Sequence, residues 1–444
     1  MEKQPNMQII FAIILLEGLV SISVEILAIR QITPFVGSNI INTSIVIGSF
    51  LLFLALGYRR GGQINENHFL VLNKNLLLSQ LFITLGLSYM FLSTLYDFTS
   101  NAYLFIIIFS LFVVGSIVYL LGQTIPILSN FFKDKSIGEI SGMVLFLSTF
   151  GSFLGSLGTA TIAINFIGVN NTIILISFIV FLVNILIFAY SRKVLYLSLS
   201  FLLLGISFVA NPKMFIISNN YSDISIEKNS NRDEVVFVVN RSGSSSLENN
   251  RTRSSFWYIQ QLEAYIGLGT ANIPEGVDIL VAGAGGFTLG INDKKNRYTF
   301  IDIDKDLKPT AEKHFLEKEI NGEFVVSSIR NYLKTSTKKF KYIILDTYSN
   351  QMTIPPFHTT QEYMLEIKER LTKDGEALFN IICKSDFSTQ YGRNINNTIN
   401  SVYNCTVLPN QYSSNLTVNM LYFCKPKWDK TIHSDNYMNL FDFK

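Results

Sequence analysis

The chain has 444 residues, of which 48% are hydrophobic and only 16% are charged, whereas charged residues make up about 25% of an average soluble protein. Its formal net charge is +3 and it has no long block of like charges, which excludes the basic arm typical of a nucleic-acid-binding protein. Residues 1–211 carry few charged side chains, and residues 212–444 carry most of them. We therefore predict a membrane domain followed by a water-soluble domain, with the lipid bilayer and not a nucleic acid as a partner.

The first half contains seven apolar stretches, each close to the roughly 20 residues that a helix needs to cross a bilayer. They lie at about 8–28, 39–58, 74–95, 102–123, 139–164, 170–190 and 194–211. The last stretch is the shortest, so six spans remain an alternative to seven. We predict a polytopic α-helical bundle over residues 1–211 in the cell membrane, and oligomers are compatible with this arrangement.

Basic residues cluster in alternate connections between these stretches. They are Lys3, Arg59, Arg60, Lys74, Lys133, Lys135, Arg192 and Lys193. The opposite connections hold only Arg30 before the final linker. The positive-inside rule then predicts a cytoplasmic N-terminus, and seven spans would place the soluble domain outside.

Glu17, Ser21 and Glu25 follow one another at intervals of four residues, so they share one face of the first helix. Ionisable groups are expensive inside a membrane, and this face is expected to point into the bundle. Two interpretations stay open. In the first, Glu17, Glu25 and Arg30 belong to a buried substrate or proton site. In the second, the carboxylates are protonated or paired, with Arg30 as one partner, and only fix helix packing.

Small residues recur along the fifth stretch at intervals of three or four positions. They are Ser148, Gly151, Ser152, Gly155, Ser156 and Thr159. Such a ladder lets the backbone of a neighbouring helix approach closely. We therefore expect this helix to pack tightly against another one.

The second half alternates short apolar runs with helical patterns, after a β-rich segment at Val235–Val239. Strands are predicted at 278–282, 298–304, 324–326, 342–345 and 377–382, and helices at 257–266 and 360–371. This alternation is typical of a doubly wound, Rossmann-like α/β fold. We predict that this domain covers residues 212–430 and is followed by a tail at 431–444.

The strand at 278–282 runs directly into the glycine-rich turn Gly283–Gly290. Such a turn lets backbone N–H groups approach a ligand at the carboxyl edge of a parallel sheet. Acidic residues stand at the ends of the next predicted strands, at Asp302, Asp304 and Asp346. A carboxylate after the second strand can accept both hydroxyls of a ribose. The alternative for each acid is a solvated strand end, but their recurrence around one glycine turn favours a ligand site.

These motifs resemble the spermidine/spermine synthase family, whose catalytic domain has the class I methyltransferase fold. The resemblance covers about residues 224–426 and rests on Val281–Gly286, Ile301–Asp304 and Asp346–Ser349. The segment Ile354–Tyr363 resembles the branch in which this domain follows a polytopic membrane region. The first two helices of that branch are matched by Gly18, Glu25, Arg30, Gly37, Ser38 and Ala55–Gly57.

The resemblance implies a transferase that uses S-adenosylmethionine or its decarboxylated form. By analogy with the cytosolic synthases it also implies a cytoplasmic soluble domain, whereas the loop charges predict an external one. In that interpretation Gly283, Gly285 and Gly286 border the cofactor. Asp302 and Asp304 lie at its ribose.

The same resemblance assigns Asp346 as the base near the reacting amine, with Tyr348 beside it in the catalytic set, and Ser328 at the adenine. The transferred group is expected to be aminopropyl or methyl. The acceptor is expected to be a small molecule or one that the membrane presents. Proximity and alignment would contribute more to this transfer than covalent catalysis.

The chain departs from soluble polyamine synthases in the residues that bind amine and adenine. The differing positions are Gly286–Phe287 in place of an acidic residue, Ser328 and Ser349 in place of Asp, and Tyr258–Gln260 in place of a Tyr-His-Glu segment. A polycationic amine needs carboxylates to replace its lost hydration, so spermidine synthesis itself is not expected.

Two other functions therefore stay open. One is a transporter or sensor whose soluble domain binds a small molecule, and the other is an extracytoplasmic enzyme that uses no S-adenosyl cofactor. The three cysteines lack a metal-binding spacing, and no metal site is predicted. Cys405 and Cys424 can pair in an oxidising compartment.

Overall fold

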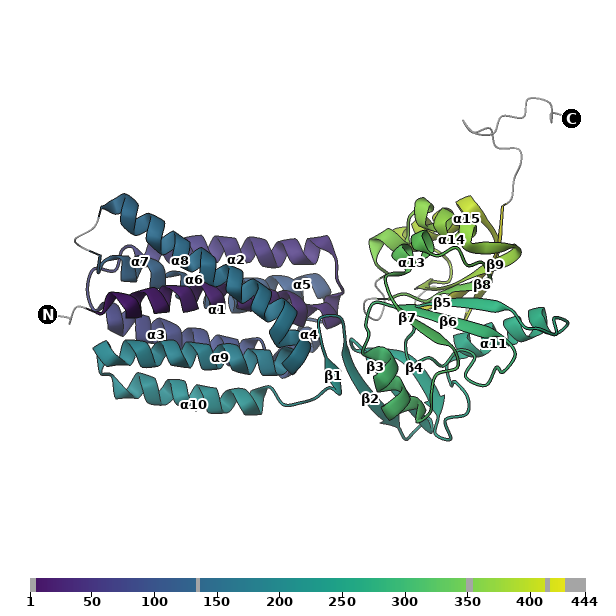
Figure 1. The fold of residues 1–444 in the computed structure, drawn as a ribbon, viewed down its shortest axis with the longest axis horizontal. Helices are drawn as coiled ribbons and strands as arrows, with labels where there is room; N and C mark the ends of the chain where they lie inside the picture. Colours follow the sequence, from purple (N-terminus) through teal and green to yellow (C-terminus); the bar gives the residue numbers. More distant parts are fainter. Residues whose placement is uncertain (1–4, 133–135, 349–353, 412–415, 428–444) are drawn as a thin grey trace, which may run out of the picture. The chain divides into compact units, whose positions relative to one another are not determined.

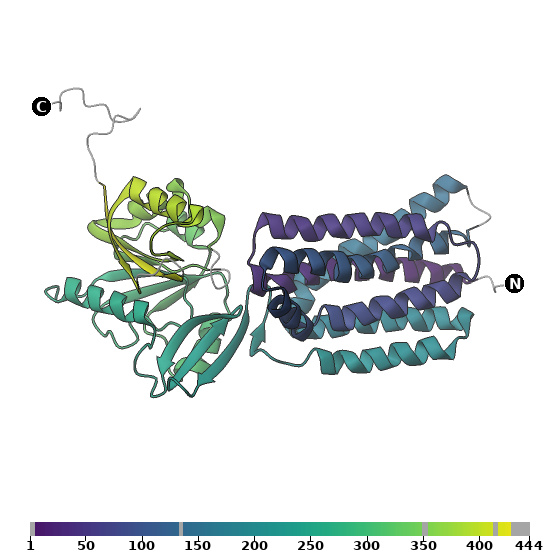
Figure 2. The same ribbon diagram turned by 180° about the vertical axis from the view of Figure 1, so that it is seen from behind.

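The computed structural model describes residues 5–132, 136–348, 354–411 and 416–427. The chain divides into two compact units, Met1–Ser225 and Ile226–Lys444 (Figures 1 and 2). The predicted boundary after residue 211 follows the last helix of the first unit, which ends at Ala210. Several predicted features lie outside the described residues: Lys3, Lys133, Lys135, Ser349 and the tail at 431–444.

The first unit is a helical bundle (Figure 1). Its helices are α1 (Met7–Val36), α2 (Ile40–Gly61), α3 (His68–Leu81), α4 (Tyr89–Thr99), α5 (Ala102–Ile108), α6 (Gly115–Gly122), α7 (Thr124–Ser129), α8 (Ile137–Leu157), α9 (Ile164–Ser191) and α10 (Val194–Ala210). Short π-helical turns extend α3, join α5 to α6 and join α8 to α9, at Phe82–Gly86, Phe109–Val114 and Gly158–Ala163. In the part of the chain that the structure describes, five helical segments are long and apolar enough to cross a membrane.

The predicted number of spans depends on how two of these regions are counted. The segment Ile137–Ser191 has 55 residues and is interrupted at Gly168, whose φ of 82° and ψ of 168° are not helical. The break lies within α9 and divides the segment into two helical parts, residues 137–167 and 169–191. The 17-residue α10 is shorter, but the side chain of Ser200 donates a hydrogen bond to Gln80 of α3 (2.5 Å). Hydrogen bonds of this kind hold helices together where lipid offers no polar partner.

The predicted span at 74–95 is wrong in its extent. The helix begins at His68 and its π-helical extension ends at Gly86, and Tyr89 starts a separate short helix. Ser88 caps the second helix, because its Oγ accepts a hydrogen bond from the Phe91 N–H (3.3 Å). The apolar pattern runs through this break, so hydropathy alone does not reveal it.

The small-residue ladder of α8 packs against α1. A Cβ at Gly151 would lie 2.1 Å from the Leu15 carbonyl oxygen, and one at Gly155 would lie 2.4 Å from the Leu19 carbonyl oxygen. On α1, a Cβ at Gly18 would lie 2.2 Å from the Ser148 carbonyl oxygen. The two helix backbones are therefore as close as the ladder predicts.

Contacts within the first unit establish which chain segments share an end of the bundle. The backbone N–H of Asn6 donates to the Tyr190 hydroxyl (3.0 Å), and the Tyr190 ring stacks on Phe69 (5.1 Å). The starts of α1 and α3 therefore lie beside the end of α9. At the other end of α1, Arg30 forms an ion pair with Asp223 (2.8 Å). Residues before α1 and residues 217–223 thus lie at opposite ends of the bundle.

The remaining chain forms two sheets and their helices. A small sheet has the order β1 (Ile217–Ser218), β2 (Asp223–Asn229), β3 (Glu234–Val239) and β4 (Ser242–Glu248). A larger sheet has the order β10 (Tyr403–Pro409), β11 (Thr417–Pro426), β9 (Leu371–Lys384), β8 (Phe340–Leu345), β5 (Asp278–Ala282), β6 (Arg297–Asp302) and β7 (Glu323–Val326). The helices are α11 (Trp257–Thr270), α12 (Leu307–Ala311), α13 (Ile329–Thr335), α14 (Gln361–Arg370) and α15 (Gln390–Val402).

The larger sheet confirms the predicted doubly wound α/β fold. Strands β5 to β9 pair in parallel, whereas β11 runs antiparallel to both β9 and β10. The chain builds outward from β5 to β6 and β7, then returns to the other side of β5 to add β8 and β9. The order reverses between β5 and β8, and ligands of open α/β sheets bind at the carboxyl ends of strands at such a point.

Candidate active site

The turn after β5 lies directly against the end of β8. Gly283 has a φ of 89°, and a Cβ there would lie 2.1 Å from the carbonyl oxygen of Asp346. The Asp346 N–H donates to the Ala282 carbonyl oxygen (2.9 Å), which continues the pairing of the two strands. Glycine is therefore required at position 283, and the structure brings the predicted glycine turn and the predicted base together.

The rest of the glycine turn packs on the β3–β4 hairpin. Gly285 has a φ of 51°, and a Cβ there would lie 2.8 Å from the Ser244 Oγ. The Gly286 N–H donates to the Ser245 Oγ (2.9 Å). The sequence alone did not predict that Ser245 accepts this hydrogen bond, although the run of serines in a short β-segment was visible. The hairpin thus fixes the conformation of the turn.

Asp302 joins the ends of β5 and β6. One of its carboxylate oxygens accepts a hydrogen bond from the Ala284 N–H and the other from the Asp304 N–H, both at 3.1 Å. Burial raises the pKa of Asp302 to about 6. A carboxylate has about four acceptor positions, so these two bonds leave capacity for further donors such as ribose hydroxyls. Asp304 is itself buried and accepts from the Asp306 N–H (3.0 Å), which shapes the turn into α12.

Asp346 is partly buried and is held by two neutral side chains. The Asn380 amide donates to its Oδ1 (3.0 Å), and the Tyr258 hydroxyl is also hydrogen-bonded to the carboxylate. Burial raises the pKa of Asp346, and burial together with the negative charge of Asp346 raises the pKa of Tyr258. Asn380 was not predicted, although a polar residue inside the apolar run of β9 is a visible signal. These partners orient the carboxylate without neutralising it.

Tyr348, which was predicted to act with Asp346, is engaged by the backbone of β9. Its hydroxyl donates to the Asn380 carbonyl oxygen (2.9 Å) and accepts from the Ile382 N–H (2.9 Å). The side chain thus ties the segment after β8 to the neighbouring strand. We infer that Tyr348 positions Asp346 by fixing the backbone segment that carries it.

Ser328 lies at the start of α13. Its Oγ accepts a hydrogen bond from the Asn331 N–H (3.2 Å), which caps that helix, and the residue is exposed. A serine in this position supplies a neutral hydroxyl at the end of β7. It offers no negative charge to a ligand.

The three predicted polar residues of α1 are not brought together. The Ser21 hydroxyl donates to Glu17 (2.8 Å), as their spacing predicts, and Glu25 is partly buried further along the helix. Thirteen residues separate Glu17 from Arg30, which is about 20 Å along a helix. Arg30 pairs instead with Asp223, and its Nε donates to the Asn219 carbonyl oxygen (2.6 Å).

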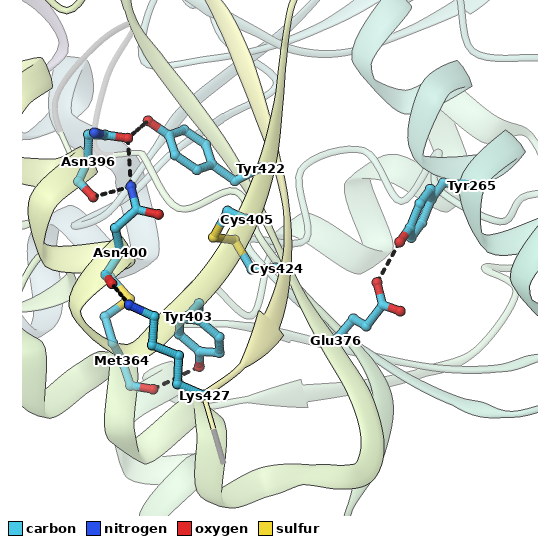
Figure 3. The surroundings of a disulfide bond; sticks show 10 residues. All are labelled: Tyr265, Met364, Glu376, Asn396, Asn400, Tyr403, Cys405, Tyr422, Cys424 and Lys427. Carbon is cyan, nitrogen blue, oxygen red and sulfur yellow. Dashed lines mark hydrogen bonds between the residues drawn. A yellow bond between two sulfur atoms is a disulfide. The ribbon is translucent and has the colours of Figure 1, made fainter. Parts of the chain in front are cut away.

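The two cysteines whose pairing the sequence left open form a disulfide. Cys405 of β10 and Cys424 of β11 are directly opposite one another in the antiparallel pair (Figure 3). Cys383 is buried and free. Among the described residues, no group of three or more His, Cys, Asp and Glu side chains could hold a metal ion.

No protein-family model matches the chain, and no curated protein matches it. Solved structures with a similar fold include a protein from Corynebacterium glutamicum described as a "probable spermidine synthase" (18% identity, 46% of this chain and 77% of that chain, TM-score 0.40). Others are the spermidine synthase of Thermotoga maritima (16%, 46% and 69%, 0.34) and human methyltransferase-like protein 13 in complex with SAH (16%, 41% and 85%, 0.31). All three TM-scores are below 0.5, so the fold assignment rests on strand order and direction in the C-terminal unit itself.

Proposed function

We propose that the protein is a membrane-bound transferase of the spermidine-synthase type, which moves an aminopropyl or methyl group from an S-adenosyl donor to an acceptor. One observation carries the proposal. The glycine turn after β5 lies against the backbone of Asp346, the residue of the proposed base, at the point where the strand order of the sheet reverses.

The residues around the glycine turn fit a nucleoside. Gly283 and Gly285 have positive φ values, so the backbone turns sharply at the carboxyl end of β5, where ligands of open α/β sheets bind. Asp302 retains acceptor positions for the ribose hydroxyls beside its two backbone bonds. When bound, such a donor would supply a carbon activated by a neighbouring sulfonium.

Asp346 accepts the proton that the nucleophilic atom of the acceptor releases. Its pKa lies above the ordinary aspartate value because the group is desolvated, which makes it a better base than a solvated carboxylate. Asn380 and Tyr258 fix the direction of the carboxylate. Tyr348 holds the segment that carries it.

Calorimetric titration of the full-length protein in lipid nanodiscs tests the donor. We expect S-adenosylmethionine or its decarboxylated form to bind, and Asp302→Asn to weaken that binding at least 10-fold. Asp386→Asn is the matched control because Asp386 is exposed. Absence of binding by both compounds would contradict the donor assignment.

The soluble domain is proposed to lie on the external side of the membrane. Basic residues at the end of α2 and after α9 lie at the same end of the bundle as the N-terminus, and residues 217–223 lie at the other end. The positive-inside rule makes the basic end cytoplasmic. A disulfide between Cys405 and Cys424 also supports an oxidising compartment.

Two reporters fused after Lys444, one active only outside the cytoplasm and one only inside, test this side. We expect activity from the external reporter. A cytoplasmic result would overturn the external position and leave the transferase intact. An external result combined with no S-adenosyl binding would favour an extracytoplasmic enzyme that uses another donor.

A second candidate function is the movement of protons or a small solute through the bundle. It is favoured by Glu17, which is 3% exposed and whose Oε2 has no hydrogen-bond partner among the described residues. A buried carboxyl of this kind in a span marks a functional site by default. Labelling with a hydrophobic carbodiimide tests it: we expect modification at Glu17 that Glu17→Gln removes, and an unlabelled Glu17 would contradict this candidate.

A further inference from the structure

A small cavity lies beside the Asp346 carboxylate within the C-terminal unit. Its polar lining includes Thr347, His358, Tyr363 and Asn380, and most of its other lining side chains are aliphatic or aromatic. Thr347 directly follows Asp346, and the amide of Asn380 donates to the Asp346 carboxylate. The cavity is therefore one side chain away from the proposed base.

Three buried polar atoms of the cavity lining lack hydrogen-bond partners within the described part of the chain. They are the Oδ1 of Asn380, the hydroxyl of Tyr363 and the Nε2 of His358. Asn380 is 3% exposed and Tyr363 is 1% exposed. A buried polar atom without a partner is costly, about 1–3 kcal/mol each, so three of them around one cavity indicate a hydrogen-bonding occupant.

The cavity offers neutral groups only. The His358 ring stacks on Tyr363 (4.9 Å between centroids), and its Nδ1 lies 2.9 Å from the Thr347 Oγ1. Burial and then the positive charge of Arg330 lower the pKa of His358 to about 4, so the ring is neutral at physiological pH. None of the residues described around the cavity is a carboxylate.

The charged side chains beside Tyr363 form an ion pair, so they give this side of the cavity no net charge. The Arg330 guanidinium lies 5.9 Å from the centre of the Tyr363 ring, and it forms an ion pair with Glu366 (2.5 Å). An ammonium group in the cavity would lose its hydration and would find no carboxylate among the lining residues to replace it.

We propose that this cavity is an acceptor subsite that takes a neutral hydrogen-bonding end group, such as a hydroxyl, and discriminates against an ammonium. The inference rests on the proposed function, since it defines the acceptor of the same site. The cavity volume of about 20 Å³ suits a group of the size of a water molecule or hydroxyl. The acceptor is then a short amino alcohol or a molecule with that kind of end, and not a diamine.

The test compares two probes of equal length, 4-amino-1-butanol and 1,4-diaminobutane. Both are titrated into the full-length protein in nanodiscs, without a donor. We expect the amino alcohol to bind at least 10-fold more tightly. We expect Tyr363→Phe to weaken its binding about 5- to 10-fold, because one hydrogen bond is lost, and to leave diamine binding unchanged.

Tyr422→Phe is the matched control, since Tyr422 is equally buried, donates to Asn396 (Figure 3) and is not among the residues that line the cavity. His358→Asp is a second variant that adds a carboxylate and is expected to shift the preference toward the diamine. Folding of each variant is checked by tryptophan fluorescence, because Trp257 begins α11 of the C-terminal unit.

Equal or tighter binding of the diamine to the unaltered protein would overturn the proposal. Amino-alcohol binding that does not change in the Tyr363→Phe variant would also overturn it. A protein that binds an S-adenosyl compound but neither probe would overturn it too, because water alone would then fill the cavity. If the amino alcohol binds through Tyr363 and no S-adenosyl compound binds, the subsite stands and the proposed donor fails.

Discussion

The bundle and the α/β unit handle buried polar groups in different ways. In the bundle, interior polar groups such as Gln80 and Ser200 are neutral and bond between helices, and the buried ion pair of Arg30 and Asp223 lies at one end. In the α/β unit, the carboxylates of Asp302 and Asp346 lie at strand ends, held by N–H and amide donors. Lipid offers no hydrogen bonds, which favours internal pairing of polar groups in the bundle and makes the unpartnered Oε2 of Glu17 an exception among the described residues. A sheet edge, by contrast, can keep a carboxylate available to a ligand.

Asp346→Asn tests the α/β side of this comparison and is expected to have the largest effect. Removal of a general base lowers turnover by about 10²–10⁴-fold, while the amide keeps the size of the side chain. Loss of donor, measured by mass spectrometry with 4-amino-1-butanol as acceptor, reports the rate. Asp386→Asn should change it less than about 2-fold, and an active Asp346→Asn protein would show that this carboxylate is not the base.

Arg30→Ala tests the bundle side. It leaves Asp223 as a buried charge without its cation, which costs about 3–5 kcal/mol. Detergent-driven unfolding of the full-length protein, followed by helix circular dichroism, measures the change. The double variant Arg30→Met with Asp223→Leu should recover most of the loss, and an equally unstable double variant would show that the charges themselves do not set the effect.

Gly151→Ala tests how tightly the bundle is packed. The added methyl group would meet the Leu15 carbonyl oxygen at 2.1 Å, so we expect a loss of about 1–3 kcal/mol. Gly142→Ala on the same helix is the control, because nothing lies within 4 Å of a Cβ there. That control should be neutral or slightly stabilising, and equal losses in both variants would argue against close packing of α1 and α8.

The ionisation of Asp302 is expected to give the smallest of these effects, a pH-dependent change in the free energy of unfolding. Its pKa in the folded protein is about 6, above the ordinary aspartate value of 3.8, so the folded state holds the proton more tightly than the unfolded state. Its contribution to stability is therefore present below pH 3.8 and is lost as the pH rises through about 6, a change of about 1–2 kcal/mol. Tryptophan fluorescence melts across this range should show a fall that Asp302→Asn abolishes, and parallel curves would contradict it.

Local patterns in the sequence were sufficient for the division into bundle and α/β unit, the glycine turn and the acids at strand ends. Apolar stretches of membrane length and the alternation of strands with helices are visible without knowledge of the fold. The ladder on α8 likewise predicted a close helix contact, because small residues at that spacing share one face.

The tertiary structure alone decided which distant residues meet. Asp223 is 193 residues from Arg30, Asn380 is 34 residues from Asp346, and Cys405 faces Cys424 only because β10 and β11 pair in that register. The tertiary structure also places the Tyr348 hydroxyl against the backbone of β9, and it interrupts the predicted span at Ser88. Sequence patterns report the local preference of a segment for water, lipid, helix or strand, whereas these contacts depend on how segments remote in the chain pack together.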